Sequence, residues 1–232
     1  MKRTELHLHT KFSDSIALID VCEIIDRAEE LGLSAVAFTS LGSVQDFHSI
    51  EKTASKKNFK AIYGAEVKYR TEEGDFSATL LVKNNEGLKE LYRVLSSLDE
   101  EKYIDVCVLK ENRKNLLVGS AGYNGELFDK ISKKINERKL ENLCAFYDYF
   151  ELYPARFDED EEVNHQIYSL SEDIGVLCVA VSNAHYLTEN DAVCRDILLE
   201  ARKIQQDNLN LSLRSYDELL SEFSYLGNDS AR

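Results

Sequence analysis

Short apolar runs alternate with longer stretches of helical period along most of the 232 residues, and this rhythm restricts the fold more than any other feature. Strands that alternate with helices build a mostly parallel sheet with helical crossovers, so the chain is predicted to be an α/β protein. About seven such units predict a closed barrel. The expected strands cover residues 4–9, 34–39, 60–68, 77–83, 115–119, 149–153 and 176–182, and the expected helices cover 18–31, 44–57, 85–97, 124–137, 160–173 and 189–204.

The first expected helix carries clear signals at both ends. Asp20 is a favourable capping residue, and apolar side chains at helical spacing follow it from Val21 to Leu31. These side chains are expected to face the sheet, and Gly32 is expected to end the helix.

Length and charge limit what the chain can be. A single α/β barrel occupies about 200 to 250 residues, so residues 1–232 are expected to form one domain. Asp and Glu outnumber Lys and Arg by 42 to 28, giving a net charge of −14. Such a surface repels phosphate backbones, which disfavours direct nucleic-acid binding. An acidic protein that acts on phosphates would require a metal ion to reverse the local field.

The cysteines and the apolar runs bear on the compartment. Five cysteines without a C-x-x-C pair fit neither a disulfide framework nor a zinc ribbon, so a reducing cytoplasm is expected. The longest apolar run, residues 176–181, cannot span a bilayer, and no apolar signal segment follows Met1. We expect a cytoplasmic protein without a membrane segment.

Two histidines stand two residues apart in His7-Leu8-His9-Thr10-Lys11-Phe12-Ser13-Asp14, where the first expected strand ends. A period of two puts both imidazoles on one side of the strand. If that side is the barrel interior, both lie at the carboxyl-terminal mouth, where barrel enzymes assemble their sites, and Asp14 can reach them. The pattern fits a metal site, and it equally fits a pair of polar caps on the barrel.

This segment matches the pattern His-x-His-Thr-x-x-Ser-Asp, and on it the chain resembles the PHP (polymerase and histidinol phosphatase) family. Residues 35–39, 62–66 and 182–187 resemble later motifs of that family. Residues 117–121 and 125–128 resemble in particular the PHP domain of bacterial PolC-type DNA polymerase III. The resemblance covers almost the whole chain and implies a distorted TIM-like (β/α)7 barrel of the PHP type. The exonuclease and polymerase domains of those polymerases are not expected here.

Carried over residue by residue, the resemblance implies metal ligands at His7, His9, Asp14, Glu66 and His185.

Four other ligand positions depart from the family pattern. The family's Thr-Asp-His is Thr39-Ser40-Leu41 here, so an apolar side chain replaces an imidazole. Asp99 and Gly122 align with a histidine and a polymerase-type cysteine, and Asn183 replaces an aspartate.

These departures leave the first of three family metal positions nearly intact. His7, His9 and Glu66, with Asn183 as a candidate fourth ligand, form a set that suits zinc, manganese or iron. The second and third positions each lack a ligand and are expected to be lost. We therefore expect at most one divalent metal ion, and an empty vestigial site is the alternative.

Two functions follow from this ligand set. Phosphoester hydrolysis at such sites relies on two or more metal ions, so the losses favour a non-catalytic PHP module with a structural or partner-binding role linked to DNA replication. Replication proteins with a basic face are its expected partners. The alternative is a weak mononuclear phosphoesterase, or 3'-5' exonuclease-like hydrolase, with His7, His9 and Glu66 as ligands and Asp14 or His185 as the general base.

Aromatic side chains crowd the expected strand at 149–153. Tyr147, Tyr149, Phe150 and Tyr153 have no Lys or Arg groove beside them, so they indicate packing in the barrel wall and not a platform for nucleic-acid bases.

Overall fold

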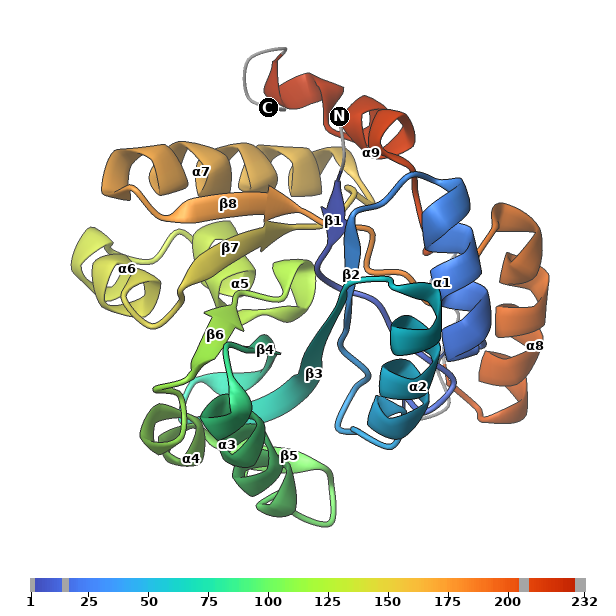
Figure 1. Ribbon diagram of the computed structural model, residues 1–232. Helices are drawn as coiled ribbons and strands as arrows, with labels where there is room; N and C mark the ends of the chain where they lie inside the picture. The colour runs from blue at the N-terminus through green and yellow to red at the C-terminus, as the bar shows by residue number, and fades with distance from the viewer. Residues whose placement is uncertain (1–2, 14–16, 205–208, 228–232) are drawn as a thin grey trace. The chain divides into compact units, whose positions relative to one another are not determined.

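The computed structural model describes residues 3–13, 17–204 and 209–227. The chain forms two compact units, Met1–Ala65 with Ser182–Ser221 and Glu66–Val181 with Glu222–Arg232. Strand β3, Ala61–Thr71, runs across the boundary between them. Figure 1 labels the elements. Among the described residues, no helix is long and apolar enough to cross a membrane.

Three parallel strands begin the first unit. β1, Thr4–Glu5, pairs with β2, Ala35–Phe38, and β2 pairs with the start of β3. All four residues of β2 are buried, as is typical of a parallel strand that is covered on both faces. The predicted strands at 34–39 and 60–68 are confirmed.

The first strand is shorter than the predicted range 4–9, and β1 ends at Glu5. The fully buried Glu5 carboxylate accepts the backbone N–H of His7 at 3.0 Å and that of Ser182 at 3.1 Å. The carboxylate thus links the segment after β1 to the segment that begins at Ser182. The backbone pairs again beyond it, where the His9 N–H donates to the Ala184 carbonyl at 2.8 Å.

Helix α1, Val21–Glu30, has the start that the sequence predicts. The Asp20 side chain accepts the backbone N–H of Cys22, and the Glu23 side chain accepts that of Asp20, which together form a capping box. The apolar side of α1 is buried, and the helix contacts α2 and β2 (Figure 1). The other helices described in this unit are α2 (Phe47–Lys57), η2 (Glu189–Asp191), α8 (Ala192–Ala201) and α9 (Tyr216–Glu222).

The second unit contains both parallel and antiparallel strand pairs. β4, Gly74–Val82, pairs with β6, Leu116–Gly119, in antiparallel orientation. β6 pairs in parallel with β7, Tyr149–Leu152, and β7 with β8, Leu177–Ala180. A short strand that the sequence did not predict, β5 at Tyr103–Asp105, pairs with the end of β3.

The helices of the second unit differ from the prediction at 106–111, where the structure has a helix, α4, that the sequence did not predict, and at 124–137. The single helix expected over 124–137 is two helices, because Lys134 adopts a left-handed conformation with φ 52° and the Asn136 side chain caps a new helix at the Lys139 N–H. Helix α7 contacts β7 and β8 (Figure 1). The helices of this unit are α3 (Asn85–Ser96), α4 (Val106–Glu111), η1 (Gly122–Asn124), α5 (Glu126–Ser132), α6 (Glu137–Cys144), α7 (Asp158–Ile174) and η3 (Ser224–Leu226).

The buried Glu5 carboxylate gives a first prediction. Arg3 donates to Glu5, and their side chains are 8% and 0% exposed. Removing one partner of a buried ion pair costs about 3–5 kcal/mol, so we expect Glu5→Ala to lower the free energy of unfolding by about that amount in urea denaturation. The control Lys89→Ala removes an exposed pair with Glu86 and should cost less than about 1 kcal/mol. Equal losses in the two variants would contradict the role given to Glu5.

Candidate metal site

His7 and His9 lie on the extended segment that follows β1. Both are fully buried, and Leu8 between them is buried as well. The two Nε2 atoms are 3.1 Å apart, and the ring centroids are 5.1 Å apart. The period of two along an extended chain therefore brings the two imidazoles together, as the sequence predicts.

His185 lies against this pair. Its segment is held by the Ala184 bridge to Leu8, and its ring stacks on that of His9 with centroids 4.2 Å apart. The His185 Nδ1 lies 2.9 Å from the backbone carbonyl oxygen of Asn183. Because a carbonyl can only accept, Nδ1 donates in this contact, and Nε2 is the basic nitrogen whenever the ring is neutral.

Ser13 holds the His9 ring from the side opposite His7. The Ser13 hydroxyl lies 2.7 Å from His9 Nδ1, and the backbone N–H of Leu41 donates to the same hydroxyl at 2.7 Å. A partner on the second ring nitrogen fixes the orientation of a histidine ligand. Leu41 thus contributes to the site through its backbone.

Glu66 lies on β3, one residue beyond Ala65, and is 4% exposed. His7, His9 and Glu66 each offer one ligand atom, and these atoms all lie within 4.8 Å of one another. Two nitrogens that bind one zinc ion tetrahedrally at about 2.0–2.1 Å are about 3.3 Å apart, close to the observed separation of the His7 and His9 Nε2 atoms. The three residues fit one divalent metal ion.

The structure does not place the other predicted site residues in this ligand group. Asp14 lies outside the described residues. His185 is not a member of the ligand group found among the residues that the structure describes. Asn183 is buried with φ 48°, and its backbone carbonyl orients His185. Asp99 holds a surface turn, where its carboxylate accepts the N–H groups of Glu101 and Tyr103 at 2.9 Å.

Sequence reasoning missed one buried carboxylate near His9. Asp46 is fully buried, and its Oδ2 accepts the hydroxyls of Thr10 at 2.7 Å and Ser40 at 2.9 Å. Ser40 stands where the family motif has an aspartate, so Asp46 brings a carboxylate to this place from six positions further along the chain. An aspartate at the start of an expected helix suggests a cap, but the Asp46 side chain makes no capping bond.

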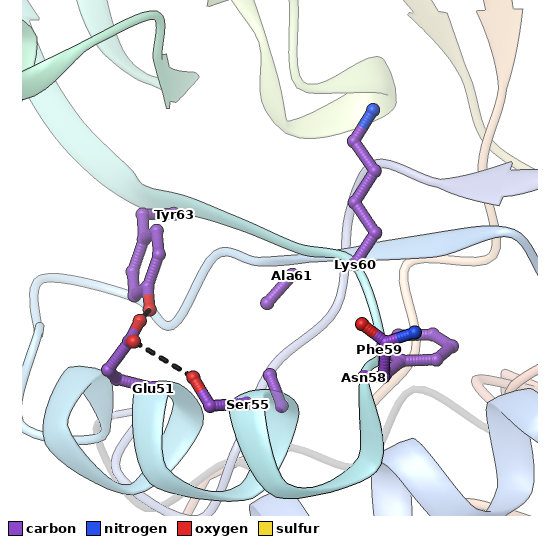
Figure 2. A pocket seen from close by; sticks show the side chains of 8 residues that line it. Glu51, Ser55, Asn58, Phe59, Lys60, Ala61 and Tyr63 are labelled. Carbon is purple, nitrogen blue, oxygen red and sulfur yellow. Dashed lines mark hydrogen bonds between the residues drawn. The ribbon is translucent and has the colours of Figure 1, made fainter.

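A hollow beside α2 is lined by residues between Glu51 and Tyr63 (Figure 2). The hydroxyls of Tyr63 and Ser55 donate to Glu51 at 2.6 and 3.0 Å, so these polar groups bind one another, while Lys60 points away from them. The hollow lies where β3 begins, whereas barrel sites are assembled at the carboxyl ends of strands. We assign it no role.

Comparison with known proteins identifies the class. The model of the PHP domain family matches residues 5–160, more than half of the chain, and the chain belongs to this family. Curated relatives include the PolC-type DNA polymerases III of Staphylococcus haemolyticus, 32% identical, and of Staphylococcus aureus, 34% identical, each over 177 residues. Each match covers 66% of this chain and 12% of the relative's length.

Solved structures share the fold at low sequence identity. A proposed metal-dependent phosphoesterase from Bifidobacterium adolescentis gives a TM-score of 0.55 with 14% identity, covering 97% of this chain and 96% of the other. A two-domain protein from Bacteroides vulgatus with a predicted PHP-like phosphoesterase gives 0.56 with 14% identity, covering 96% and 63%. The predicted α/β fold of the PHP type is confirmed.

Asp46 should make stability depend on pH. Burial raises the pKa of this carboxyl above 3.8, and its hydrogen bonds to Thr10 and Ser40 offset only part of that rise. The folded chain therefore holds the proton more tightly than the unfolded chain, so the contribution of Asp46 to stability is greatest at low pH and falls as pH rises through the raised pKa.

Asp46→Asn removes this titration. We expect the free energy of unfolding of the wild type, minus that of the variant, to decrease between about pH 4 and pH 7 in urea denaturation with chelator present. Asp26→Asn is the control with the opposite sign, because Lys57 holds the pKa of Asp26 below its usual value. A difference for Asp46→Asn that is constant with pH would contradict the prediction.

Proposed function

We propose that the chain is a PHP module that holds one divalent metal ion, zinc, manganese or iron, on His7, His9 and Glu66, and that its role is structural or partner-binding. The observation that carries the proposal is the buried His-His-Glu group, whose ligand atoms lie within 4.8 Å of one another. A bound ion would supply a Lewis acid at this place. The protein's own part is to orient the ligands, as Ser13 does for His9.

Three features support a single ion. The residue at 41 offers only its backbone N–H to the site, and Gly122 has no side chain to offer. Asp99 makes its hydrogen bonds within a surface turn. Phosphoester hydrolysis at PHP-like sites benefits from several ions that clamp the phosphate, so a one-ion site fits a non-catalytic role better.

The similarity to PolC-type polymerases supports a role in DNA replication. We propose that residues 1–232 form a single PHP domain in a cytoplasmic protein and that its partners are replication proteins. The net charge of −14 favours a partner with a basic face over direct contact with DNA. The matched relatives are polymerases of which this chain spans 12%, so their own activity is not transferred to it.

A second candidate function is a weak mononuclear phosphoesterase or 3'-5' exonuclease-like hydrolase. One observation favours it: the buried His185 ring stacks on His9 with its basic Nε2 remote from the Asn183 carbonyl that binds Nδ1. In this alternative His185 or Asp14 would accept a proton from the attacking water, and the metal ion would lower the pKa of that water.

Metal analysis tests the one-ion site on which both proposals rest. We expect protein purified without chelator to contain about one equivalent of zinc, manganese or iron, because His7, His9 and Glu66 supply one ligand set. His7→Ala/His9→Ala should remove it. His48→Ala/His165→Ala is the matched control, since it deletes two exposed helical histidines and should keep the metal. Elemental analysis of the three proteins is the measurement.

Activity on a phosphodiester and a phosphomonoester substrate then decides the role. A rate no higher than that of the His7→Ala/His9→Ala variant supports the non-catalytic module. A rate that falls by about 100-fold or more in that variant and in His185→Ala establishes the hydrolase instead. Absence of metal from the wild type after loading would overturn the one-ion site.

A further inference from the structure

One face of β7 carries a carboxylate between two phenols. Tyr149, Glu151 and Tyr153 alternate along the chain, so they share a face, and they are 3%, 0% and 2% exposed. The aromatic side chains of this strand indicate packing in the barrel wall. A glutamate that is fully buried between tyrosines needs a reason beyond packing, because an ionised carboxylate is costly to bury.

Two glycines opposite this face leave room for its side chains. A Cβ at Gly119, the last residue of β6, would collide with the Glu151 carboxylate and the Tyr149 hydroxyl. A Cβ at Gly122 would lie 2.5–2.7 Å from three atoms of the Tyr153 ring. The space that a side chain at 122 would occupy is therefore filled by Tyr153.

The Tyr153 ring is held in this place. Tyr123 packs edge-on against it with ring centroids 4.9 Å apart, and the Arg156 guanidinium lies 4.1 Å from the centroid of Tyr123. Arg156 is fixed in turn by Asp160, which accepts from its Nε at 2.7 Å. The amide of Asn164 donates to the Tyr153 backbone carbonyl at 3.0 Å.

The Tyr153 phenol also lies within the field of two carboxylates. Burial raises its pKa well above the usual value of 10.0, and the charges of Glu151 and Glu66 raise it further. The phenol therefore stays protonated at neutral pH and is a neutral hydrogen-bond donor beside acidic groups. A metal ion beside the two carboxylates would instead neutralise them by its positive charge.

We propose that Tyr153 and Gly122 form a reciprocal exchange that closes the second metal position, which the family resemblance implies at Glu66 and the residues at 99 and 122: the ring fills the space of a ligand at 122 and so excludes an ion there. Tyr153 thus limits the number of metal ions together with the changes at positions 41 and 99. The metal part of this inference rests on the proposed one-ion site, whereas the steric part does not.

Unfolding temperatures test the steric part without any metal. Gly122→Asn is the chosen variant, because asparagine tolerates the left-handed φ of 47° better than other side chains, so its cost reports mainly the collision with the ring. With chelator present, we expect Gly122→Asn to lower Tm by about 5 °C or more in the wild type, and by less than about half as much in a Tyr153→Leu background. Equal shifts in both backgrounds would overturn the exchange.

Manganese binding tests the metal part. In Tyr153→Leu/Gly122→Asp a smaller aliphatic side chain replaces the ring and a carboxylate stands at 122, so we expect one more equivalent of Mn²⁺ than in the wild type by calorimetric titration. Tyr153→Leu/Gly122→Asn, of the same shape but uncharged, should gain none. No additional equivalent in a double variant that folds, or two equivalents in the wild type, would overturn the inference.

The two proposals fail in different ways. If the wild type holds no zinc or iron as purified and binds no Mn²⁺, the proposed one-ion site is wrong. The exchange is then judged by the Tm comparison and by whether Tyr153→Leu/Gly122→Asp gains an ion over the wild type. If the wild type binds one ion and the double variant also binds one, the one-ion site stands and the role given to Tyr153 is wrong.

Discussion

The histidine cluster depends on one buried ion pair. Glu5 accepts the N–H groups of His7 and Ser182, and Arg3 donates to Glu5 and to the Ser182 hydroxyl. This carboxylate links two segments that are remote in the sequence, so His9 and His185 meet. A buried charge is tolerated here because several donors surround it.

Much of the fold was open to prediction because its causes are local. The capping box at Asp20 and the apolar spacing that follows it define α1, and the buried run of β2 is visible as four consecutive apolar residues. The meeting of His7 and His9 follows from the period of an extended chain. Glu66, by contrast, was found through family resemblance, since its spacing from the histidines carries no local signal.

What escaped prediction arises from contacts between remote segments. Asp46 lies near the start of the helix expected at 44–57, where its position suggests only a helix cap. The fold brings its carboxylate to Thr10 and Ser40. Glu151 can be seen in the sequence as a lone carboxylate in an apolar strand, two residues from Tyr149 and from Tyr153. Its contacts with the glycines opposite can be found only in the structure. The division of the helix expected at 124–137 follows from a left-handed residue that helical periodicity does not reveal.

Two positions that depart from the ligand pattern implied by the family resemblance make other specific contacts. Where an imidazole is lost, the backbone of Leu41 binds Ser13, and Ser13 holds His9. Where a side chain is lost at Gly122, the Tyr153 ring fills the space. Loss of ligands without compensation would leave buried polar groups facing empty space, at a cost in stability. The contact of Leu41 with Ser13 instead supports His9, one of the ligands that remain.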